Sequence, residues 1–70
     1  MADVVIKGEM IRLGQLLKLA GVIGTGAEVK AVLGEGAVRV NGEPEIRRGR
    51  QLHPGDVVTA GEAVLRVTSG

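Results

Sequence analysis

Residues 38–44 read Val38-Arg39-Val40-Asn41-Gly42-Glu43-Pro44. In this stretch the apolar residues Val38 and Val40 alternate with less apolar ones, as they do in a strand with one buried face. Asn41-Gly42 predicts a type I′ turn, because both central residues of that turn need a positive φ, which Asn and Gly adopt most easily. The stretch therefore predicts a β-hairpin in the middle of the chain.

The chain after this hairpin predicts further strands separated by tight turns. His53-Pro54-Gly55-Asp56 has the form of a turn with Pro at its second position. Val57-Val58 begins the next strand, and residues 63–67 predict a last one with Leu65 and Val67 on one face. The C-terminal half is therefore expected to be β structure.

Before the hairpin the hydrophobic period is that of a helix. Leu13, Leu16, Leu17 and Ala20 fall within one arc that is about 100° wide, with polar residues opposite. This pattern predicts a two-turn amphipathic helix, which Gly21 can end in a left-handed conformation.

A second helix is expected directly after the first. Thr25-Gly26-Ala27-Glu28 has the form of a capping box and predicts its start. Val29, Val32 and Leu33 form its apolar stripe, and residues 34–36 stop it. With an edge strand at residues 4–6, the order predicts a single α+β domain over residues 1–70.

Composition excludes several chemistries. The 70 residues contain no Cys, Phe, Tyr or Trp, and 11 Val, 7 Leu and 4 Ile must supply the core. Without cysteine there is no disulfide, thiolate zinc site or thiol nucleophile. No apolar run approaches the roughly 20 residues of a membrane span, and the N-terminus does not resemble a signal peptide. We expect a cytoplasmic protein.

Catalytic and cofactor motifs are absent from the sequence. Gly21-Val22-Ile23-Gly24-Thr25-Gly26 lacks the spacing of dinucleotide and P-loop motifs, so its glycines are expected to be structural. His53 is the only imidazole and belongs to a turn, which leaves no partner set for a triad. We therefore expect no enzymatic activity, no metal, no cofactor and no small-molecule substrate.

The segment Arg47-Arg48-Gly49-Arg50 concentrates positive charge in a chain whose net charge is only +1. In an extended strand its neighbouring arginines would alternate between two sides. The guanidinium fork is suited to bidentate binding of phosphates, which indicates a nucleic-acid site. The alternative is a solvated charged segment partly neutralised by Glu43 and Glu45.

These features together resemble a known family. The matching segments, in order, are residues 12–23, residues 25–30, Val38 to Pro44, Arg47 to Arg50 and residues 54–58. They resemble the S4 RNA-binding domain, and more closely the small stand-alone bacterial S4 proteins of the YaaA and YbcJ type.

The resemblance implies an αL fold, in which two helices pack on a small, mostly antiparallel sheet of three to five short strands. It also implies that structured RNA lies along the helix pair and the adjacent hairpin. The RNA-binding residues expected by position are Arg12, Lys18, Lys30, Arg39, Asn41, Arg47, Arg48 and Arg50.

The sequence thus predicts a monomeric, non-enzymatic protein that binds ribosomal or transfer RNA, with a role in ribosome assembly or RNA metabolism. Sequence-specific binding of unpaired bases generally uses aromatic side chains, which this chain lacks, so recognition of RNA shape is expected. Two alternatives stay open. One is a protein-interaction adaptor that docks through Leu19 and residues 21–26, and the other is an RNA-targeting subunit of an RNA-modifying enzyme.

Overall fold

The computed structural model describes residues 1–24 and 26–70. Within these residues seven strands and two helices are found, and the expected α+β class is confirmed. In chain order they are β1 (Ala2–Ile6), β2 (Ile11–Arg12), α1 (Leu13–Leu19), α2 (Gly26–Gly34), β3 (Val38–Val40), β4 (Glu43–Pro44), β5 (Gln51–Leu52), β6 (Val57–Ala60) and β7 (Ala63–Ser69).

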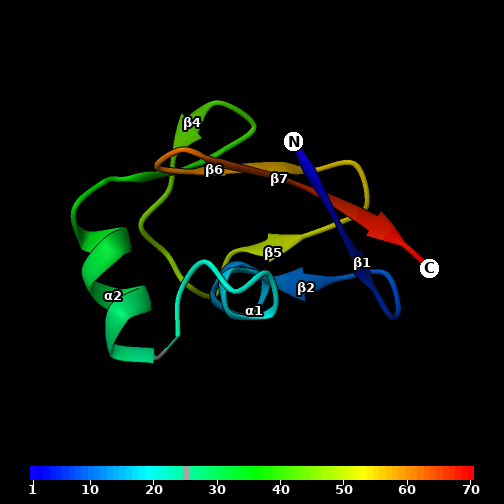
Figure 1. Cartoon of the computed structure of the whole chain (residues 1–70), viewed down its shortest axis with the longest axis horizontal. Helices are drawn as coiled ribbons and strands as arrows, with labels where there is room; N and C mark the ends of the chain where they lie inside the picture. The colour runs from blue at the N-terminus through cyan, green and yellow to red at the C-terminus, as the bar shows by residue number, and fades with distance from the viewer. Residues whose placement is uncertain (25) are drawn as a thin grey trace.

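Five strands form one sheet in the order β1-β7-β6-β3-β4, and β2 and β5 form a separate two-stranded pair (Figure 1). All neighbours in the large sheet are antiparallel except β1 and β7, which run parallel with Val4 opposite Val67. The mostly antiparallel sheet and the edge position of β1 agree with the sequence prediction. The parallel pairing of the first strand with the last had no local signal in the sequence.

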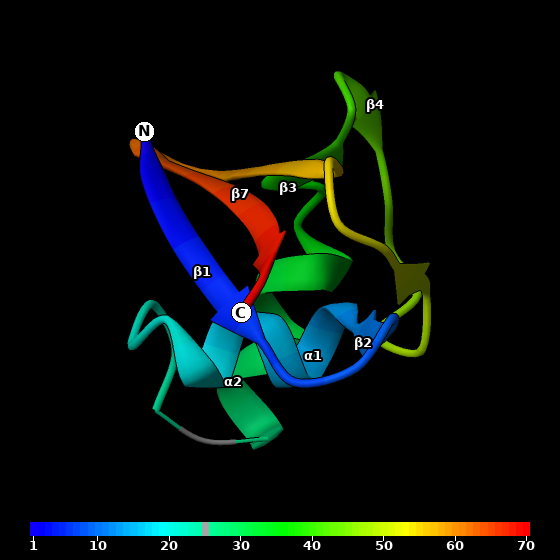
Figure 2. The same cartoon turned by 90° about the vertical axis from the view of Figure 1, so that its right-hand side faces the viewer.

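Both helices lie on one side of the sheet, so the molecule has two layers with the core between them (Figure 2). The helices contribute Leu13, Leu16, Leu17, Val29 and Leu33 to this core. The sheet contributes Val4, Ile6, Val38, Val40, Val58, Ala60, Leu65 and Val67, and Ile23 and Leu52 complete it. Burial of these aliphatic groups is the main force that holds the layers together.

The first helix begins where the β2–β5 pair ends. Ile11 and Arg12 pair with β5, and the Gln15 Oε1 atom accepts a hydrogen bond of 3.1 Å from the Arg12 backbone N–H. This bond fixes the first turn in the manner of half a capping box. Gly21 follows the helix with a φ of 74°, the left-handed conformation expected for a helix stop.

The two predicted turns are confirmed. Asn41 and Gly42 have φ values of 52° and 85°, as a type I′ turn requires. The Asp56 N–H donates a 3.0 Å hydrogen bond to the His53 carbonyl and closes the turn before β6. The predicted capping box at Thr25 lies outside the described residues. Among the described helices, none is long and apolar enough to cross a membrane.

Candidate nucleic-acid interface

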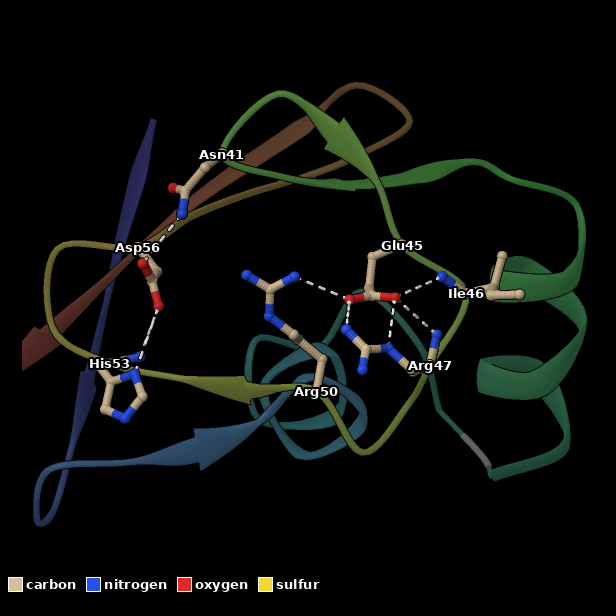
Figure 3. A network of polar contacts seen from close by, with 7 residues as sticks. All are labelled: Asn41, Glu45, Ile46, Arg47, Arg50, His53 and Asp56. Carbon is tan, nitrogen blue, oxygen red and sulfur yellow. Dashed lines mark hydrogen bonds and ion pairs between the residues drawn. The ribbon is translucent and has the colours of Figure 1, made fainter.

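Glu45 organises the loop that carries the arginine cluster (Figure 3). This residue is only 7% exposed. Its carboxylate accepts five hydrogen bonds: two from the backbone N–H groups of Ile46 and Arg47, two from the Arg47 guanidinium and one from the Arg50 guanidinium, all between 2.9 and 3.2 Å. The guanidinium of Arg47, followed by that of Arg50, lowers the pKa of Glu45 from 4.5 to about 2. The carboxylate is therefore ionised at neutral pH and fixes the loop.

The same loop is hydrogen-bonded to the first turn of α1. The backbone N–H groups of Leu13 and Gly14 donate to the carbonyls of Arg50 and Arg48, both at 2.9 Å. These helix N–H groups have no partner within the helix, so the loop satisfies them. The loop packs closely here, since a Cβ atom at Gly14 would lie 3.5 Å from the Arg48 Cβ, in ordinary van der Waals contact.

Residues 45–50 therefore form a folded loop and not the strand considered from the sequence. The Arg50 N–H donates a 3.2 Å hydrogen bond to the Arg47 carbonyl, which makes a turn around Arg48 and Gly49. The three arginines do not alternate between two sides of a strand. Arg47 and Arg50 both reach the Glu45 carboxylate, and Arg48 is directed elsewhere.

Arg48 meets two of the other predicted cations at a surface pocket of about 420 Å³, here named the cationic pocket. Its lining is Arg12, Gly14, Gln15, Lys18, Val29, Arg48 and Gly49. Within the described part of the chain, Arg12, Lys18 and Arg48 make no ion pair. Three cations that are separated in the sequence are thus gathered without a compensating carboxylate.

Lys30 lies beside a second pocket, which it shares with Arg48. The lining of this apolar pocket is Lys30, Leu33, Gly34, Ile46 and Arg48. Arg48 consequently stands between the two pockets and connects Lys30 to the group formed by Arg12 and Lys18. The structure brings these four predicted residues to one region.

Arg47 and Arg50 line a third pocket, on the other side of Gly49, together with Gln51 and His53. The Arg47 guanidinium remains more than half exposed although it binds Glu45, and this bond raises its pKa above the ordinary value. The alternative expectation that Glu45 neutralises part of the cluster is correct for these two arginines.

Asn41 and Arg39 lie at the hairpin and outside the linings of these pockets. The Asn41 side chain donates to Asp56 at 3.1 Å and accepts from the Val57 N–H at 2.9 Å, so it joins the hairpin to the next turn. Burial raises the pKa of Asp56, but hydrogen bonds from the His53 N–H and from Asn41 outweigh it and the net shift is downward. Arg39 donates to the Gly42 carbonyl at 3.4 Å.

Two contributors were not assigned to the site from the sequence. Gln15 lines the cationic pocket and caps the Arg12 N–H, and the Gly14 N–H donates to the Arg48 carbonyl and so joins the loop to the helix. The spacing of Arg12 and Gln15 is that of a capping pair, which was a usable signal for Gln15. For Gly14 the decisive neighbour, Arg48, is distant in sequence, so no local pattern identifies it.

Two comparisons with known proteins found matches to this chain. The family model described as S4 domain matches residues 4–68. The chain is also similar to the probable ribosome maturation protein RlbA of Bacillus subtilis strain 168, with 58% identity over 53 residues that cover 76% of this chain and 75% of the relative.

Proposed function

This chain belongs to the S4 domain family, and from that premise we propose that it binds structured RNA through phosphate contacts and catalyses no reaction. The observation that carries the proposal is the cationic pocket. Its three cations come from the last residue of β2, from the last turn of α1 and from the loop after β4, so only the folded chain assembles them.

Gathering like charges without a carboxylate is unfavourable unless a partner supplies negative charge. RNA phosphates are such a partner, and guanidinium groups bind them with two parallel hydrogen bonds. Glu45 and the α1 N-terminus hold the loop in place before RNA arrives, which reduces the ordering cost of binding. The arrangement is suited to binding the phosphate backbone.

In this proposal Arg12, Lys18 and Arg48 contact phosphates and Lys30 extends their row across α2. Arg47 and Arg50 have a mainly positional role through Glu45, with the exposed side of Arg47 available to RNA. Contacts from Arg39 and Asn41 stay a prediction. The absence of aromatic residues favours recognition of RNA backbone shape over stacking on aromatic rings.

The relative named as a probable ribosome maturation protein makes ribosomal RNA the first candidate ligand. We propose that the chain acts as a monomer in the cytoplasm on ribosomal RNA or on an assembling ribosomal subunit, with transfer RNA as the alternative ligand. Contacts to the backbone alone fit either RNA, because both present double-helical stems of the A form.

The test is the salt dependence of RNA binding by single-cation variants. Three to five engaged cations predict that log K falls with log salt with a slope of roughly −2 to −4. Arg12→Gln, Lys18→Gln and Arg48→Gln should each weaken binding to purified ribosomal RNA and make that slope less steep by about 0.7 to 0.9.

The matched control is Arg66→Gln, which removes a cation from β7 that pairs with Asp3. It should leave both the affinity and the slope at wild-type values. Equal effects of the Arg66 and Arg48 variants would contradict the proposed site. The proposed function itself would be contradicted if the wild-type protein did not bind RNA.

A further inference from the structure

The apolar pocket differs in character from the cationic pocket beside it. Ile46 projects from the loop toward α2 and is 68% exposed, although it is a large apolar residue (Figure 3). Leu33 is buried beneath the pocket, and Gly34 adds no side chain to its wall. The pocket has a volume of about 520 Å³, within the range of small-ligand sites.

Charge limits what this pocket can receive. Lys30 and Arg48 line the pocket, and none of the described residues in its lining is acidic. The nearby Glu45 carboxylate is already occupied by Arg47 and Arg50. An occupant must therefore combine an apolar surface with a negative group, and it must lie beside whatever binds at Arg48.

We propose that the apolar pocket receives one unpaired nucleotide of the bound RNA, with its base against Ile46 and Leu33 and its phosphate between Lys30 and Arg48. This inference rests on the proposed function and adds a base contact to it. Because Arg48 borders both pockets, a single RNA strand can pass from the phosphate contacts of the cationic pocket into the apolar one.

An unpaired nucleotide has the required chemistry. Its base presents flat, weakly polar faces, and its phosphate carries the negative charge. Bases that are splayed out of a helix commonly pack against protein side chains or guanidinium planes. Here aliphatic groups and Arg48 replace the missing aromatic rings.

The test compares two labelled RNA hairpins of the same sequence. One carries a single bulged adenosine, and the other carries an abasic residue at that position. Wild-type protein should bind the bulged hairpin about fivefold more tightly than the abasic one, since only the first has a base to bury. Ile46→Ser should lose this difference, with an unchanged salt slope, because no ionic contact is removed.

Leu19→Ser is the matched control. Leu19 is 60% exposed and borders a different pocket, formed with Ile6, Lys7, Met10, Ile11 and Gln15. This variant should keep the preference for the bulged hairpin. Lys30→Gln should weaken both hairpins and reduce the salt slope by about 0.7 to 0.9.

The outcomes separate the two proposals. If wild type binds both hairpins with a steep salt slope but Ile46→Ser keeps the same preference, the nucleotide site is wrong and the phosphate site stands. The same conclusion follows if Ile46→Ser weakens both hairpins equally, because the loss then does not depend on the base. If wild type binds neither hairpin nor ribosomal RNA, the proposed function itself fails.

Discussion

Glu45 gives the arginine cluster its shape. A buried carboxylate is unfavourable unless it is paired and hydrogen-bonded, and Glu45 meets this condition with both guanidinium and backbone donors. The same contacts decide which arginines remain unpaired. The acidic residue Glu45 thereby determines which arginine side chains of the cluster are free to bind an anion.

Glu45→Gln tests this role. The amide N–H₂ group of glutamine replaces one carboxylate oxygen and faces donors that then lack an acceptor, so the free energy of unfolding should fall by about 1 to 2 kcal/mol. Urea unfolding measures the change. Glu43→Gln, an exposed position in the hairpin, is the control and should stay within about 0.5 kcal/mol of wild type. Equal stability of the two variants would contradict the organising role.

The pH dependence of stability should reflect the same carboxylate. The pKa of Glu45 is lowered from 4.5 to about 2 in the folded protein. A depressed folded pKa stabilises the fold above the unfolded value, and this contribution is lost as the pH falls toward the folded value.

Wild type should therefore lose more stability than Glu45→Gln between about pH 6 and about pH 3, as measured by urea unfolding at each pH. Asp56, whose pKa is also lowered, adds an acid-sensitive contribution to both proteins and cancels in the comparison. Parallel pH profiles for wild type and variant would show that the carboxylate is not held as the structure places it.

At the scale of elements, the β3–β4 hairpin depends on Asn41 for two separate reasons. Its φ of 52° is favourable for Asn and Gly but strained for other residues. Its side chain also joins Asp56 and the Val57 N–H. Substitutions can separate the backbone contribution from the hydrogen bonds.

Asn41→Gly should destabilise the protein by about 1 kcal/mol, because it loses the hydrogen bonds but keeps the turn conformation. Asn41→Ala should cost about 2 kcal/mol, since it adds left-handed strain. Urea unfolding gives the order of stability, and an equal loss in both variants would contradict the contribution of the φ angle. RNA affinity of folded Asn41→Gly then shows whether Asn41 also contacts RNA.

Local chemistry explains which elements the sequence predicts well. The Asn41-Gly42 turn, the Pro54-Gly55 turn and the apolar stripe of α1 each depend on a few neighbouring residues, and all are confirmed. The parallel β1–β7 pair and the contact of Gly14 with Arg48 join distant segments, so no local pattern encodes them.

The candidate site also has features that the sequence predicts and features that depend on the fold. Its cations were identified as residue types, and the family resemblance supplied their positions. Which of them are unpaired depends on where Glu45 lies in the fold. The sequence could not show that Arg47 and Arg50 are paired and that Arg48 is not. That difference arises in the folded loop, where a turn brings Arg47 and Arg50, but not Arg48, to the buried Glu45 carboxylate.

At the scale of the whole molecule, the sheet joins the first and last strands of the chain, because β1 pairs with β7. Ile6 of β1 is 4% exposed in the core, whereas its neighbour Val5 is 60% exposed. Removing one methylene by Ile6→Val should lower the free energy of unfolding by about 1 kcal/mol.

Val5→Ala is the control for this pair and should change stability by less than about 0.5 kcal/mol, although it removes more carbon atoms. Urea unfolding of both variants provides the measurement. A larger loss at Val5 than at Ile6 would mean that β1 presents its other face to the core and that its register with β7 is shifted by one residue.

Charge placement, and not net charge, should govern RNA affinity. The net charge is only +1, and physiological salt screens exposed charges beyond a Debye length of about 8 Å. Arg48→Gln combined with Glu62→Gln removes one positive and one negative charge, so the net charge stays +1. Glu62 lies exposed in the turn between β6 and β7.

Measured by filter binding to ribosomal RNA at physiological salt, the double variant should bind as weakly as Arg48→Gln alone. Glu62→Gln alone, with a net charge of +2, should bind like wild type. If instead the double variant recovers wild-type affinity, a long-range field and not the cationic pocket attracts the RNA. If the cationic pocket binds the RNA, affinity should stay low in the double variant. A phosphate bound at Arg48 needs a guanidinium at that position, and the loss of a distant carboxylate charge adds little to its binding.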